Sequence, residues 1–137
     1  MYLLVGARTR SAAEGCAYDL RSLRRATIVG AATAGAARPG DLFRLTAAVA
    51  AFSPTGRAIN PRTGTDWEGV GVVPDVAVAE GDALAIAHRL ALRRVLAALD
   101  ATGDEADTAL RDEVRAALPN RRGMARRIVR LAEGTAR

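Results

Sequence analysis

Residues 2 to 30 read YLLVGARTRSAAEGCAYDLRSLRRATIVG, in which two short apolar runs enclose a longer amphipathic segment. The runs Tyr2 to Gly6 and Ala26 to Gly30 have the length and character of strands buried in a parallel sheet. Between them, residues 11 to 24 carry apolar side chains at the spacing of one helix face. The stretch therefore predicts a β-turn-α-β unit, in which functional groups collect at the carboxyl ends of the strands.

A β-hairpin is predicted next, although apolar and polar side chains alternate only weakly there. Phe43 to Phe52 predicts the first strand, residues 54 to 56 (Pro-Thr-Gly) are typical of a turn, and Arg57 to Ile59 predicts the return strand. Residues 76 to 78 can add one short extended piece.

A helical tail follows residue 80. Apolar spacing predicts helices over residues 82–99, 104–118 and 121–133. We therefore expect one α/β fold, divided into a core of residues 1–80 and a helical tail of residues 81–137.

The composition excludes several kinds of site. All twenty basic residues are Arg, so a Ser–Lys catalytic dyad cannot form within the chain. The single imidazole, His88, lies between apolar positions of a predicted helix and is typical of a core or helix-surface histidine. Cys16 cannot form an internal disulfide and predicts a small buried side chain. Without a His/Cys cluster we expect no metal and no cofactor.

The net charge of +5 makes nucleic acid a partner to consider. Most Arg residues alternate with Asp and Glu, and the terminal Arg cluster lacks aromatic side chains that could stack on bases, so we expect a solvated helix face and no nucleic acid. The N-terminal apolar run is too short to span a membrane and has no basic flank before it, so no span and a cytoplasmic location are expected. The terminal Arg cluster comprises Arg115, Arg121, Arg122, Arg126, Arg127 and Arg130.

Ser11 and Glu68 are the candidate catalytic residues, each with a structural alternative. Ser11 opens the first predicted helix, where free N–H groups favour a developing negative charge, but residues 11 to 14 (Ser-Ala-Ala-Glu) are equally typical of a capping box, which the pattern alone favours. Glu68 is either an orienting carboxylate beside Trp67 or an exposed Glu in a Gly-rich turn. We expect Trp67 to pack in the core.

The segment from Ala31 to Gly40 is almost wholly Ala, Gly and Thr. Such a loop lets another backbone approach closely, which suits a substrate groove. Gly35 and Arg38 are its predicted substrate-binding residues.

Four segments together resemble a known family. Residues 8 to 14, 18 to 30, 54 to 61 (PTGRAINP) and 66 to 75 (DWEGVGVVPD) are similar, in order, to motifs of the tail-specific (C-terminal-processing) serine peptidases, in their tricorn-like and interphotoreceptor-retinoid-binding-protein-like branch. The match runs from about Tyr2 to Val78. It implies the C-terminal part of a β-β-α superhelix core, as in the protease and crotonase families, and peptide-bond hydrolysis through an acyl-serine.

The resemblance also implies roles for individual residues. Ser11 is the family's nucleophile, the N–H of Ala12 is one oxyanion donor, and Glu68 completes a Ser/His/Ser/Glu relay. The family's His and bridging Ser precede the nucleophile and have no counterpart here, so we expect a truncated catalytic domain without its base. It is expected to act on peptides or proteins and to form a homo-oligomer or dock to a missing N-terminal half. The alternative is a non-catalytic module of the same scaffold that holds an apolar ligand or peptide.

Overall fold

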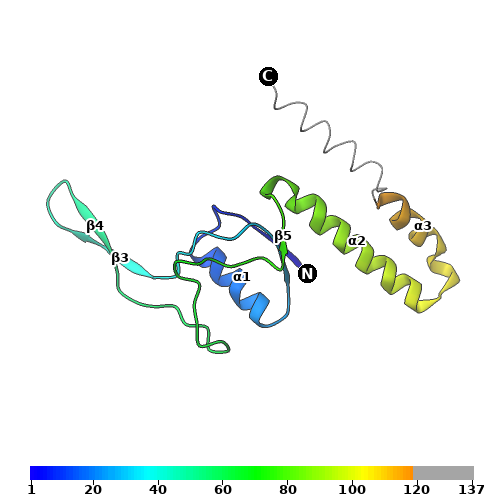
Figure 1. Ribbon diagram of the computed structural model, residues 1–137, viewed down its shortest axis with the longest axis horizontal. Coiled ribbons are helices and arrows are strands. Elements are labelled where there is room, and N and C mark those ends of the chain that lie inside the picture. The colour runs from blue at the N-terminus through cyan, green and yellow to red at the C-terminus, as the bar shows by residue number, and fades with distance from the viewer. Residues whose placement is uncertain (119–137) are drawn as a thin grey trace, which may run out of the picture. The chain divides into compact units, whose positions relative to one another are not determined.

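The computed structural model describes residues 1–118 (Figure 1). The helix predicted over residues 121–133, and the Arg cluster beyond Arg115, lie outside the described residues. The chain divides into two compact units, Met1–Ala87 and His88–Arg137.

The first unit is built on a three-stranded parallel sheet in the order β1-β2-β5. Strand β1 (Tyr2–Val5) leads through a turn into helix α1 (Ala12–Ser22), which returns the chain to β2 (Thr27–Gly30). The register pairs each residue of β1 with one of β2, and the short β5 (Val76–Ala77) pairs on the other side of β2. The predicted β-turn-α-β unit and the α/β class are confirmed.

The core lies between this sheet, helix α1 and the loops that follow. Ala17 and Ile28 have no exposed surface, and Val72 has almost none. Trp67 is 7% exposed and its ring centroid lies 5.3 Å from that of Tyr18. The burial of Trp67 confirms its predicted place in the core.

Cys16 is exposed, so the expectation of a buried thiol was wrong. Helix α1 buries Glu14 and Ala17, which are three residues apart and share one face of the helix. Cys16 lies off that face.

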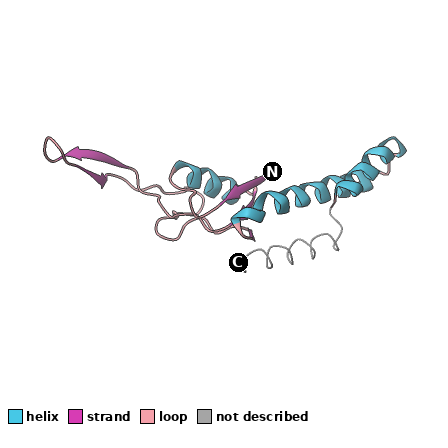
Figure 2. Ribbon diagram, turned by 90° about the horizontal axis from the view of Figure 1, so that it is seen from above, coloured by secondary structure: helices cyan, strands magenta, loops and turns pink. Residues whose placement is uncertain are grey.

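The hairpin forms, but its turn is not where the sequence predicted it. Strand β3 (Gly40–Arg44) pairs antiparallel with β4 (Ala50–Pro54), and the two strands are the magenta pair of Figure 2 that is separate from the parallel sheet. The turn therefore spans residues 45–49, where the Thr46 hydroxyl accepts the N–H groups of Ala48 and Val49 at 3.2 and 3.1 Å.

The predicted turn at residues 54 to 56 does not connect the strands of the hairpin: Pro54 is the last residue of β4, and Thr55 and Gly56 follow it. There the N–H groups of Thr55 and Gly56 donate to the Pro39 carbonyl at 3.0 and 3.3 Å. Large apolar side chains lie on both faces of the hairpin, because Leu42 pairs with Phe52 while Phe43 projects from the opposite face. This distribution explains why the alternation in the sequence was weak.

Helices dominate the chain after β5. A short 3-10 turn (Glu80–Asp82) leads into α2 (Ala83–Thr102), and a second (Glu105–Asp107) leads into α3 (Thr108–Ala117). The two predicted helices within the described residues are confirmed, with shifted ends. No described helix combines the length and the hydropathy needed to span a bilayer.

The connection between α2 and α3 is fixed by polar contacts. The Asp104 side chain accepts the Ala106 N–H at 2.9 Å and so caps the 3-10 turn. The Arg111 guanidinium donates to the Leu99 carbonyl at 2.7 Å and lies 3.7 Å from the Asp100 carboxylate. His88 is exposed on α2.

We expect Trp67→Ala to lower the free energy of unfolding by about 3–5 kcal/mol, because small neighbours cannot fill the void left by an indole. Phe52→Ala is the matched control, since that ring is 60% exposed, and it should change the free energy by at most about 0.5 kcal/mol. Urea unfolding of both variants measures the difference. Equal losses would contradict a core centred on Trp67.

Candidate active site

Ser11 occupies the N-cap of α1, at the end of the turn that follows β1. Its backbone has φ 55° and ψ −125°, a conformation that costs a residue other than Gly about 1–3 kcal/mol. Among the described residues, Arg24 is the only other residue besides glycine that has a positive φ. Strain of this kind at a strand-to-helix turn is the backbone feature of nucleophile elbows.

The capping box of Ser11 and Glu14 is present, but only its Glu14 half has normal hydrogen-bond geometry. The Ser11 N–H donates to Glu14 Oε2 at 2.8 Å, whereas the Ser11 side chain makes no cap hydrogen bond. Ser11 is exposed, so its hydroxyl remains accessible. The N–H of Ala12, at the first position of α1, has no acceptor within the described residues.

The turn between β1 and Ser11 is held on both sides. The Thr9 N–H donates to the Gly6 carbonyl at 2.9 Å, and the Gly6 N–H returns a bond to Thr9 Oγ1 at 3.1 Å. The Ala34 N–H donates to the Thr9 carbonyl at 2.9 Å, and Glu80 Oε1 accepts the Ala7 N–H at 2.5 Å. These bonds fix the segment that carries Ser11.

Glu14 has no exposed surface, and its carboxylate accepts four hydrogen bonds. Oε1 accepts the Thr33 hydroxyl at 2.5 Å and the Gly35 N–H at 2.6 Å. Oε2 accepts the Ala36 N–H at 2.9 Å together with the Ser11 N–H. One buried carboxylate thus joins the N-terminus of α1 to the loop of residues 33–36.

Burial raises the pKa of Glu14, but the four hydrogen bonds outweigh it. The Thr33 hydroxyl and the N–H groups of Ala36, Gly35 and Ser11 all favour the charged carboxylate, so its pKa lies below the usual value. Glu14 is therefore ionised at neutral pH.

Glu68 follows the buried Trp67 and reaches the same loop. Its Oε2 accepts the Ala37 N–H at 2.7 Å, and its Oε1 lies 3.4 Å from Arg38 Nε. Asp66 Oδ1 in turn accepts the Glu68 N–H at 3.0 Å. The bond from the Arg57 guanidinium lowers the pKa of Asp66, and the Glu68 N–H adds to that effect.

Ser11 and Glu68, the two predicted catalytic residues, are therefore linked through one loop. Two consecutive N–H groups of this loop bind the two carboxylates, since Ala36 donates to Glu14 and Ala37 donates to Glu68. The structure thus places both residues in a single hydrogen-bonded network.

Gly35 and Arg38, the predicted substrate-binding residues, differ in what they offer a ligand. Gly35 is buried, and its N–H and carbonyl are used by Glu14 and by the Gly69 N–H. Its φ is +80°, and an added Cβ would lie 3.0 Å from the backbone of Gly69, so Gly35 shapes the loop. The Arg38 side chain is 49% exposed and available.

Thr33 is a site residue that the sequence analysis missed. Its hydroxyl donates to Glu14 while accepting the Val72 N–H at 2.7 Å, and so connects the loop to the segment after Glu68. Glu14 was predicted only as part of a helix cap. The available signal was the position of Glu14 three residues before Ala17, on the apolar face of α1, where a carboxylate requires donors.

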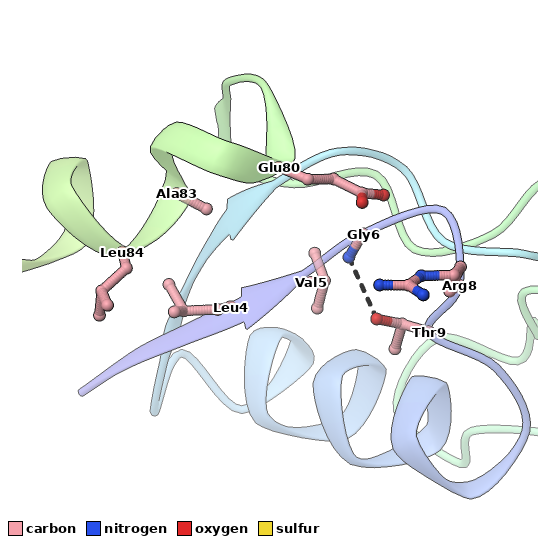
Figure 3. Close-up of a pocket in the computed structure, with 8 residues that line it drawn as sticks. All are labelled: Leu4, Val5, Gly6, Arg8, Thr9, Glu80, Ala83 and Leu84. Carbon is pink, nitrogen blue, oxygen red and sulfur yellow. Dashed lines mark hydrogen bonds between the residues drawn. The ribbon is translucent and has the colours of Figure 1, made fainter.

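A small cavity of about 250 Å³ lies at the carboxyl end of β1, beside the turn that leads to Ser11 (Figure 3). Figure 3 shows the Glu80 carboxylate beside Gly6 on one wall. Its volume is below the range of about 300–1,000 Å³ usual for small-molecule sites. Among residues 1–118, no group of acidic, His or Cys side chains could hold a metal ion. The cavity is lined by Leu4, Val5, Gly6, Arg8, Thr9, Glu80, Ala83 and Leu84.

Residues 1–78 match the family model of peptidase family S41. This match covers more than half of the chain, and the chain belongs to that family. A solved structure, a photosystem II D1 C-terminal processing protease, is similar at 29% sequence identity and a TM-score of 0.47. The similarity covers 57% of this chain and 20% of the protease. The resemblance to tail-specific serine peptidases is confirmed by the family match.

Acid should weaken the fold through Glu14. Because the folded-state pKa is lowered, the stabilisation is complete above the unfolded-state pKa and is lost as the pH falls through the folded-state pKa. Urea unfolding between about pH 6 and pH 3 should therefore show a smaller loss of stability with acid in Glu14→Gln than in the wild type. Glu113→Gln, at an exposed position on α3, should retain the wild-type pH dependence; an unchanged slope in Glu14→Gln would contradict the assignment.

Proposed function

We propose that this chain carries the nucleophile and the acidic member of a serine peptidase site, with Ser11 as the nucleophile and Glu68 as the acid. The observation that supports it most is the conformation of Ser11: a strained backbone at a strand-to-helix turn, with an exposed side chain. A serine that only capped α1 would be expected to have an extended backbone.

The proposed reaction is acyl transfer to Ser11. Ser11 Oγ bonds to the carbonyl carbon of the scissile peptide, its proton passes to a general base, and the carbonyl oxygen becomes an oxyanion. The Ala12 N–H, free at the positive end of α1, stabilises that oxyanion. The C–N bond then breaks as the amine takes the proton, and water hydrolyses the acyl-serine. We assign Arg38, half exposed beside Glu68, to the substrate groove.

We propose further that the general base lies outside residues 1–137, on an upstream segment or on a partner. The chain contains no Lys, and its single His, His88, is exposed on α2. Within residues 1–118, β1 pairs with β2 alone and offers an open edge for an added strand, which suits a segment that docks on this unit.

A fluorophosphonate probe tests the nucleophile, because serine attack on phosphorus releases fluoride and leaves a stable adduct. The chain has two other serines, of which Ser53 is exposed on β4 and serves as an internal control. We expect slow labelling that favours Ser11 over Ser53, since only Ser11 lies beside free helix N–H groups. Peptide mass spectrometry locates the adduct, which Ser11→Ala should abolish.

The variant His88→Ala examines the source of the base. We expect it to leave the slow labelling of Ser11 unchanged. Fast labelling that His88→Ala abolishes would show that the base is His88. Equal labelling of Ser11 and Ser53 would refute the nucleophile assignment.

A further inference from the structure

Ser11 has a backbone conformation that it would not keep unaided. Its φ of 55° carries a strain that the surrounding structure must offset. At the N-cap of an ordinary helix the backbone is extended, and in a capping box the Glu at the third helical position accepts the N-cap N–H. In this chain the Ser11 N–H is bonded to a carboxylate that has no exposed surface.

We propose that Glu14 is the positioning residue of the site, and that its carboxylate holds Ser11 in the strained conformation that leaves the hydroxyl exposed. The inference rests on the proposed function of Ser11 as the nucleophile. It adds the group that sets the position of that nucleophile relative to the loop of residues 33–37.

The geometry of Oε2 carries the inference. This single oxygen accepts the N–H of Ser11 at 2.8 Å and that of Ala36 at 2.9 Å, so the two backbones are held on one atom. Oε1 is bonded to the Thr33 hydroxyl and the Gly35 N–H, so the carboxylate cannot rotate without breaking both bonds. The position of Ser11 is therefore set by the loop, which also binds Glu68 through the Ala37 N–H.

The chemistry of the site requires a charged carboxylate. All four groups bonded to Glu14 are donors, so both oxygens must accept. Glutamine has the same size but replaces one acceptor with an NH₂ group, which would face at least one N–H. Glu14→Gln therefore removes bonds to one side of the carboxylate while it preserves packing. No charged side chain is among the groups bonded to Glu14.

Hydrogen exchange measured by NMR tests the positioning without any need for activity. In the folded wild type the Ser11 amide should be protected, although it lies at an exposed helix end. In Glu14→Gln its exchange should accelerate by about tenfold or more, the change expected when a charge-assisted hydrogen bond is lost. Glu113→Gln provides the control, because its side chain is exposed on α3. Unchanged protection of Ser11 in a folded Glu14→Gln would overturn the proposal.

Should Glu14→Gln fail to fold, the wild type alone decides the question. On acidification before unfolding, the amide shifts of Ser11 and Ala36 should move with one common midpoint, because one carboxylate oxygen accepts both. Different midpoints, or a Ser11 amide that does not respond, would overturn the proposal.

Probe labelling connects the positioning to reactivity. In Glu14→Gln the preference of a fluorophosphonate for Ser11 over Ser53 should fall by about tenfold, with Ser53 itself unaffected. If the Ser11 amide of Glu14→Gln exchanges faster but the probe still prefers Ser11 over Ser53, the positioning role is overturned. Absence of Ser11 labelling in the wild type would contradict only the proposed function, because the exchange measurement would still report on Glu14.

Discussion

A buried carboxylate is the constraint on which this arrangement depends. An ionised side chain without exposed surface is strongly unfavourable unless donors replace its water, and Glu14 obtains four of them. The donors come from two segments that are about twenty residues apart in the chain. Separating the N-terminus of α1 from the loop of residues 33–36 would leave the Glu14 carboxylate without hydrogen-bond donors. The carboxylate therefore holds the two segments together.

The β-turn-α-β unit could be predicted from the sequence because its signals are local. Apolar runs of strand length and the spacing along α1 depend only on neighbouring residues. The hairpin was misplaced because its register depends on a turn whose key group is the Thr46 hydroxyl, while the Pro-Thr-Gly segment that looked like a turn is bonded to the distant Pro39. Apolar side chains on both faces removed the alternation that would have revealed the strands.

The sequence predicted part of the candidate site, and it did so through its resemblance to a peptidase family more than through the spacing of residue types. Ser11 and Glu68 stand in recognisable motifs, but the capping-box pattern of Ser11 does not reveal its positive φ. The role of Glu14 and the contribution of Thr33 depend on backbone N–H groups of a distant loop. Those groups are present at every residue except Pro, so the sequence does not mark which of them meet a carboxylate.

The backbone segments around Gly35 and Gly71 approach each other closely, and this limits where side chains can be substituted. Gly35 and Gly71 both have positive φ, and a Cβ at Gly71 would collide with the Thr33 carbonyl. Natural variation cannot add side chains at these two positions without separating the loops. Substitutions that keep this backbone contact are therefore expected at the margin of the loop, where the Arg38 side chain is half exposed.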